Sequence, residues 1–543
     1  MLVYVVLLVV SARALPTAAD GRLVVHAPAG TIRGVPATDG DYVKFLGIPY
    51  ARVNASNPFG APIRHEKFDK AFKAFNEPAV CPQIKEVFYK TNESTDNYDG
   101  NLDCLRLNIF VPKSKTRNKA AYIFIYGGKF INGHSQTDIY GPKYLVRHDI
   151  IVVTFNFRSG PYGFMCTDIP EIPGNQGLRD QYAAIEWVGD NIGAFGGDPQ
   201  KLTLGGHSSG SMLVDMHLLI SRPRLFQQAI LQSGTATGPG FLHRSDTTTL
   251  VSIARELGFE TNDTYSALSF LAEASPKSVI KATENYVWRP CVEKKFEGVL
   301  PFITEDPELS DGRNVDGLKI LGGFTDQESM YSLYSIRYRS IFRLPNGLRN
   351  FLIEKIYLQN ESNLLDIIHR FYVDDDADNE IIKYEIVDML SDFIFVYPMQ
   401  RQMIKYAKHM NTSVYLYMFT YDGYLNRMKY VLNIREAGAT HSDELGYMFA
   451  TNFFSNTKYS AEQRMIDQLT TLWANFIKYG NPTPVRSELL PVSWPPLTAD
   501  TMPCLQIGAN LTLVSRPFRS RMAFWDLFFD EHLDKLLIAR AQE

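Results

Sequence analysis

The chain has 543 residues, of which 45% are hydrophobic and 13% aromatic, so it can bury an extensive core. Its 55 lysines and arginines nearly balance its 59 aspartates and glutamates, which excludes the strongly basic surface typical of nucleic-acid or anionic-membrane binders. No linker, repeat or block of like charge interrupts the sequence, and this favours one large domain over residues 15–543.

The N-terminal segment is typical of an export signal. Residues 3–10 form an apolar run, and Ala12 and Ala14 flank Arg13 in a small-x-small cleavage pattern, so residues 1–14 are predicted to be a signal peptide. Neither this run nor any later one is long enough for a membrane anchor. Six Asn-x-Ser/Thr sequons fit passage through the secretory pathway to the extracellular space: Asn54, Asn92, Asn262, Asn360, Asn411 and Asn510.

The cysteines also fit an oxidising compartment. Their number is odd, so at least one thiol is left unpaired. No pair has CxxC spacing and no HExxH motif occurs, so we expect neither a metal site nor another cofactor. The five positions are Cys81, Cys104, Cys166, Cys291 and Cys504.

Short apolar, β-branched runs alternate with helical patterns along the chain. Strands are predicted at 107–111, 122–125, 150–155, 202–204, 229–231, 318–321 and 414–419, and helices at 178–192, 210–221, 248–257 and 461–478. This alternation predicts an α/β fold with a mainly parallel sheet and right-handed crossovers. Functional loops then collect beyond the carboxyl ends of the strands, and each candidate residue below is expected just after a strand.

The first chemical motif lies between a predicted strand and a predicted helix. Residues 206–210 read GHSSG, and a G-x-S-x-G turn in this context is a nucleophile elbow that exposes the Oγ of Ser208. A serine hydroxyl needs a general base, and the base needs a carboxylate to orient it. His207 is set aside as the base, because on a tight elbow its side chain is expected to point away from the Ser208 hydroxyl.

Spacing alone leaves the other two members of a triad open. After Ser208, the acid can be Glu328 or Asp326, and the base can be His441, His369 or His409.

Four blocks of sequence resemble one known family. The block FGGDPQKLTLGGHSSG at 195–210, together with GNQGLRDQYAAIEWV at 174–188, FLGIPYA at 45–51 and LWANFIKYGNPTP at 472–484, is similar to the type B carboxylesterase/cholinesterase family. The resemblance extends from about residue 23 to residue 529 and is strongest to secreted insect carboxylesterases. It implies an α/β-hydrolase fold, a site in a gorge above the strand ends, and catalytic roles for Glu328 and His441 by position.

The same resemblance assigns further residues. The block DCLRLN at 103–108 matches a family signature and implies a Cys81–Cys104 disulfide. The family's usual second disulfide loop is missing, so Cys166, Cys291 and Cys504 stay unassigned. The oxyanion hole is implied to consist of the backbone N–H groups of Gly128, Lys129 and Ser209.

Lys129 is the main departure from the family pattern, which has glycine there. Lysine keeps its N–H, but its Cβ can crowd the acyl group or resist a backbone geometry suited to glycine. Its ammonium can also favour anionic or polar substrates. The family's common residues are also replaced at His207 and Ser329, without loss of a catalytic group.

The leading prediction is a secreted serine carboxylesterase that hydrolyses small, apolar esters through an acyl-enzyme on Ser208. A slow or inactive relative that binds and sequesters ligands is the alternative, because of Lys129. A juvenile-hormone-type esterase stays open, although such enzymes commonly carry Gln where His207 stands. A cholinesterase is disfavoured, because the loop 81–104 contains Phe88, Tyr89 and Tyr98 but no tryptophan to bind a quaternary ammonium.

Overall fold

The structure is a computed structural model that describes residues 23–85, 97–220, 222–335, 338–343, 347–356, 362–374, 379–454 and 460–542. The predicted signal peptide at 1–14, the sequons at Asn92 and Asn360, and the aromatic residues Phe88 and Tyr89 lie outside these ranges.

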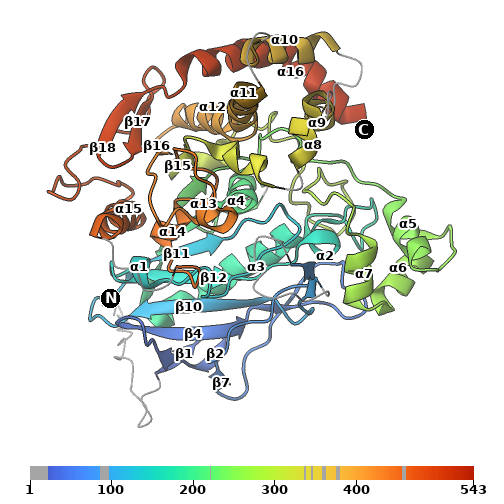
Figure 1. Ribbon diagram of the computed structural model, residues 1–543. Helices are drawn as coiled ribbons and strands as arrows, with labels where there is room; N and C mark the ends of the chain where they lie inside the picture. Colours follow the sequence, from blue (N-terminus) through green and yellow to red (C-terminus); the bar gives the residue numbers. More distant parts are fainter. Residues whose placement is uncertain are drawn as a thin grey trace, which may run out of the picture.

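Within the described ranges, eleven strands form one twisted sheet in the order β18-β17-β16-β15-β14-β13-β11-β12-β10-β4-β3 (Figure 1). The strands from β12 to β17 in this order are parallel, and antiparallel strands complete both edges. The strands are β3 (Val35–Pro36), β4 (Tyr42–Pro49), β10 (Arg106–Pro112), β11 (Lys119–Ile125), β12 (Ile151–Phe155), β13 (Gly197–His207), β14 (Gln228–Gln232), β15 (Lys319–Thr325), β16 (Ser413–Phe419), β17 (Pro503–Ile507) and β18 (Leu511–Ser515).

The central strands are buried on both faces. Every residue of β11, β12 and β14 is buried, which explains their uninterrupted apolar runs. Helices α3, α4, α12 and α15 pack against the sheet. The α-helices are α1 (Lys143–Val146), α2 (Gly160–Phe164), α3 (Gln176–Asn191), α4 (Ser209–Leu219), α5 (Thr249–Glu256), α6 (Thr264–Glu273), α7 (Pro276–Ala282), α8 (Arg339–Arg343), α9 (Gly347–Ile356), α10 (Ser362–Tyr372), α11 (Asn379–Ser391), α12 (Tyr397–Ala407), α13 (Arg427–Leu432), α14 (Leu445–Met448), α15 (Ser460–Tyr479) and α16 (Arg519–Gln542).

The predicted elements coincide with observed ones. The seven predicted strands are β10 to β16, and the four predicted helices are α3, α4, α5 and α15. Figure 1 shows α10, α11, α12 and α16 at the end of the molecule near β15 to β18, while β1 (Val24–Ala27), β2 (Gly30–Arg33) and β7 (Phe72–Lys73) lie at the opposite end. Among the described helices, none is both long and apolar enough to cross a membrane.

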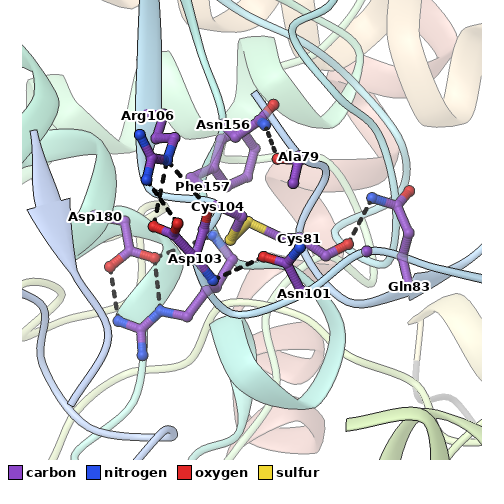
Figure 2. The surroundings of a disulfide bond; sticks show 12 residues. Ala79, Cys81, Gln83, Asn101, Asp103, Cys104, Arg106, Asn156, Phe157 and Asp180 are labelled. Carbon is purple, nitrogen blue, oxygen red and sulfur yellow. Dashed lines mark hydrogen bonds and ion pairs between the residues drawn. A yellow bond between two sulfur atoms is a disulfide. The ribbon is translucent and has the colours of Figure 1, made fainter. Parts of the chain in front are cut away.

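All five cysteines lie in the described ranges. Cys81 and Cys104 form the disulfide that the family resemblance implied (Figure 2). Cys166 and Cys291, which the sequence left unassigned, form a second disulfide across a separation of 125 residues. Cys504 is a buried free thiol.

Candidate active site

Ser208 lies on a sharp turn between strand β13, which ends at His207, and helix α4, which begins at Ser209. Its φ of 57° and ψ of −130° lie in a region that non-glycine residues rarely adopt. The flanking glycines make this turn sterically feasible: a Cβ on Gly206 would lie 2.5 Å from the carbonyl oxygen of Gly210, and one on Gly210 would lie 2.3 Å from that of Ile125. The backbone therefore has the strained geometry of a nucleophile elbow.

Glu328 and His441 form a buried hydrogen-bonded pair. The Nδ1 of His441 lies 2.7 Å from the Oε2 of Glu328, whose side chain is fully buried. The other carboxylate oxygen, Oε1, accepts a hydrogen bond of 2.9 Å from the N–H of Thr325 at the end of β15. The carboxylate is thus held at both oxygens and can fix the orientation and tautomer of the imidazole.

The position of His441 differs from one expectation. Glu328 follows β15 and Ser208 follows β13 closely, whereas His441 lies in the loop between α13 and α14 and not just after a strand. Two backbone-directed hydrogen bonds attach this loop to Glu328: the N–H of His441 and the hydroxyl of Thr440 both donate to the Glu328 carbonyl oxygen.

The competing candidates take other positions. Asp326 accepts a hydrogen bond of 2.8 Å from the N–H of Ala439 and so supports the His441 loop from outside. His409 lies 3.2 Å from Asp316, and His369 belongs to α10. None of the three is among the residues that line the cavity described below.

The imidazole of His441 lies among three other rings. Ring centroids are 4.7 Å away for Phe395, 5.7 Å for Tyr331 and 4.6 Å for His207. Burial, and next the charge of His441, lower the pKa of His207 well below its usual value, so the ring is neutral at physiological pH. His207 therefore packs beside the predicted base without adding a charge.

A second buried carboxyl group, Glu444, lies behind this pair and was not found from the sequence. Its Oε1 accepts a hydrogen bond of 3.1 Å from the Nε2 of Gln232 and lies 3.9 Å from the Nε2 of His207. Burial, together with the negative charge of Glu328, raises the pKa of Glu444 to about 8. Glu444 is therefore mostly protonated at neutral pH.

The segment that follows β11 packs directly onto the elbow. Gly128 and Lys129 have φ angles of 146° and 56°, so the lysine adopts the left-handed geometry that favours glycine. Its ammonium lies 5.4 Å from the ring centroid of Tyr338. Gln83 connects this segment to the first disulfide. It exchanges two hydrogen bonds with the backbone of Gly133. Its side-chain amide also donates a hydrogen bond to the Cys81 carbonyl oxygen (Figure 2).

A single cavity of about 450 Å³ brings the predicted site residues together. Ser208, His441, Gly128, Lys129 and Ser209 all line it, while Glu328 lies behind His441. The rest of the wall is mainly aromatic and aliphatic, and among its described residues Arg289 and Arg427 add two cationic side chains to that of Lys129. Its members include Phe130, Ile131, Ile139, Phe241, Tyr286, Trp288, Arg289, Tyr331, Tyr338, Ile341, Phe351, Ile394, Phe395, Arg427 and Val431. Size and lining are those of a small-molecule site.

Four of the six predicted sequons lie in the described ranges. The sequon asparagines Asn262, Asn411 and Asn510 are exposed, and Asn54 is half-buried. Throughout the part of the chain that the structure describes, no group of three or more His, Cys, Asp or Glu side chains is arranged to hold a metal ion.

Known proteins resemble this chain over nearly its whole length. A sequence model of the carboxylesterase family matches residues 21–525. The chain is 29% identical to esterase B1 of Culex pipiens, with 93% of this chain and 98% of the relative covered, and 28% identical to the juvenile hormone esterase of Heliothis virescens, with 94% of each covered. The crystal structure of juvenile hormone esterase from Manduca sexta, with OTFP covalently attached, superposes with a TM-score of 0.79 at 26% identity and covers 94% of this chain and all of that one.

Proposed function

The chain belongs to the carboxylesterase family, and on this premise we propose that it is a secreted serine carboxylesterase with Ser208 as nucleophile, His441 as general base and Glu328 as orienting carboxylate. The observation that carries the proposal is the buried His441–Glu328 hydrogen bond of 2.7 Å at a cavity that Ser208 also lines.

The reaction proceeds in two steps. The Oγ of Ser208 attacks the ester carbonyl carbon while the Nε2 of His441 accepts the hydroxyl proton, and this proton then passes to the departing alcohol. Water attacks the resulting acyl-enzyme, again with His441 as base, and releases the acid. Glu328 stabilises the imidazolium in both steps, and backbone N–H groups of Gly128, Lys129 and Ser209 stabilise the oxyanion.

The cavity wall supports small apolar esters as substrates. Aromatic residues such as Phe130, Phe241, Phe351 and Phe395 offer an apolar surface to the acyl or alcohol group. Because two of the relatives are juvenile hormone esterases, an ester of that type is a specific candidate. A choline ester fits poorly, since cationic side chains line the same cavity.

Lys129 supports the alternative function, in which the protein binds and sequesters its ligand. Its backbone adopts the left-handed conformation although it is not a glycine. It lies in the proposed oxyanion hole, where the loss of one hydrogen-bond donor lowers the rate by roughly 10²–10³-fold. A slow hydrolase that retains its ligand would acylate once and then stall.

Hydrolysis of 4-nitrophenyl acetate and butyrate by the purified wild type and Ser208→Ala tests the proposal. We expect steady turnover that Ser208→Ala abolishes. The acyl chain length that is hydrolysed fastest then indicates the size of the acyl pocket. A single burst without turnover, relieved by Lys129→Gly, would favour the sequestering protein instead. Turnover that persists in Ser208→Ala would refute the assignment of the nucleophile.

Export is proposed from the apolar N-terminal segment and the sequons. Expression of the full chain in a secretory host should release a glycosylated protein into the medium that begins near residue 15. Retention of residues 1–14 on a cytoplasmic product would contradict this.

A further inference from the structure

The hydroxyl of Ser209 already occupies one of the proposed oxyanion-hole donors. The N–H of Gly128 donates a hydrogen bond of 3.0 Å to the Oγ of Ser209. Both residues line the cavity, and Ser209 is only 5% exposed. The acceptor is thus the side chain of a residue whose own backbone N–H is proposed to belong to the hole.

The segment that carries Gly128 cannot easily move to release this bond. A Cβ on Gly127 would lie 2.8 Å from the Cβ of Ser208, and one on Gly128 would lie 2.0 Å from the carbonyl oxygen of Asn132. The backbone is therefore packed on both sides. The serine hydroxyl, in contrast, changes position by a rotation about χ1 between staggered wells.

We propose that the Ser209 side chain is a positioning residue that blocks the oxyanion hole of the resting enzyme and gives up the Gly128 N–H only when acyl transfer begins. This rests on the proposed esterase function. Oxyanion stabilisation depends on donors that are oriented and available before the reaction, and here one donor must first exchange acceptors. The hydroxyl consequently slows acyl transfer.

Ser209→Ala removes the hydroxyl and keeps the backbone N–H of residue 209. Because a net intramolecular hydrogen bond corresponds to roughly a 2- to 12-fold change in an equilibrium, kcat/KM for 4-nitrophenyl butyrate should rise by about that factor. Ser209→Gly should act in the same direction and serves if the alanine variant folds poorly.

A second readout separates this role from a merely structural one. An aliphatic trifluoromethyl ketone forms a tetrahedral adduct with an active-site serine and places an oxyanion in the hole. Its inhibition constant should fall in Ser209→Ala by the factor by which kcat/KM rises. The affinity for the unreactive hydrocarbon analogue of the same chain length should not change.

Ser211→Ala is the matched control. Ser211 lies on the same helix and donates a hydrogen bond of 2.6 Å to the carbonyl oxygen of Gly234, away from the Gly128 segment. It should lower the unfolding temperature without raising kcat/KM.

The outcomes distinguish the two claims. If the wild type turns over but neither Ser209 variant is faster or binds the ketone more tightly, this inference is wrong and the esterase stands. If neither the wild type nor the variants show Ser208-dependent turnover, the proposed esterase function is wrong. The inference that Ser209 blocks the oxyanion hole is then wrong as well.

Discussion

At the scale of single residues, the carboxylate of Glu328 has the clearest geometric role. One of its oxygens accepts from the backbone of Thr325 and the other lies against His441 Nδ1. A carboxylate that is fixed at both oxygens can hold the imidazole in the tautomer that leaves Nε2 free to accept a proton.

Glu328→Gln should lower kcat by roughly 10³–10⁴-fold, because an amide N–H₂ would face His441 Nδ1 and favour the wrong tautomer. Asp326→Asn is the control: its oxygen can still accept from Ala439, so it should retain most of the activity. The comparison requires only steady-state hydrolysis of one chromogenic ester. Equal losses in the two variants would contradict the choice of Glu328.

Lys129 carries a conformational cost that can be measured apart from its charge. Its φ of 56° places Cβ near a carbonyl oxygen, which costs about 1–2 kcal/mol. Lys129→Gly and Lys129→Ala both remove the ammonium, but only glycine relieves the contact.

The glycine variant should therefore be more stable than the alanine variant by about 1 kcal/mol in urea titrations, despite the greater flexibility of glycine when unfolded. Equal stability of the two variants would show that the left-handed geometry at residue 129 carries no cost.

At the scale of elements, the loop between α13 and α14 supplies both His441 and the buried Glu444. The folded-state pKa of Glu444, about 8, lies above its ordinary value of 4.5. Between these pH values the folded chain keeps a proton that the unfolded chain has released. The resulting stability is fully present below about pH 4.5 and is lost as the pH rises through 8.

Glu444→Gln abolishes this titration and keeps an acceptor for Gln232. The stability of the variant relative to the wild type should rise between pH 5 and 8 by at most about 1.4 kcal/mol per pH unit. The exposed substitution Glu297→Gln should leave the pH dependence unchanged. A pH-independent difference for Glu444→Gln would mean that Glu444 is ionised in the folded state.

Elements with strong local signals were predictable from the sequence. Buried strands such as β11 and β14 stand out by their apolar runs, and the amphipathic helix α15 stands out by its periodicity. The GHSSG turn lies between β13 and α4. The choice of Glu328 over Asp326 depended on family resemblance, since two carboxyl groups two residues apart differ only in which way a turn directs them. The Ser209–Gly128 hydrogen bond depends on contact between distant segments and has no sequence signal.

At the scale of the whole molecule, the second disulfide joins the segment after α2 to the segment after α7. Its sulfur atoms pack on Gly174, where a Cβ would lie 2.5 Å from the Sγ of Cys291 and 2.6 Å from that of Cys166. Asn175, the residue that caps α3, bonds to both the N–H and the carbonyl oxygen of Cys291. The bridge therefore helps to place the start of α3.

Replacing Cys166 and Cys291 with alanine should reduce the free energy of unfolding by about 2–5 kcal/mol. Because its loop spans 125 residues against 23 for Cys81–Cys104, its loss should cost about 1–2 kcal/mol more than loss of the first bridge in the loop-entropy account. Urea titrations of the two double variants make the comparison. A larger loss for the Cys81–Cys104 variant would contradict loop length as the cause.

The aromatic walls of the cavity were the least predictable part of the molecule. Tyr331, Tyr338, Phe351 and Phe395 come from a stretch of sequence, between β15 and β16, whose pattern predicts no helix or strand. Their convergence on Ser208 depends on how the short helices α8 and α9 and the segment before α12 pack, which no local pattern encodes.

Mass spectrometry of the intact protein after exposure to diethyl 4-nitrophenyl phosphate tests whether Ser208 is an activated nucleophile. We expect one diethylphosphoryl group per chain, located by peptide mapping on Ser208, with no addition to Ser208→Ala. An unmodified wild type, or equal modification of Ser208→Ala, would contradict Ser208 as an activated nucleophile.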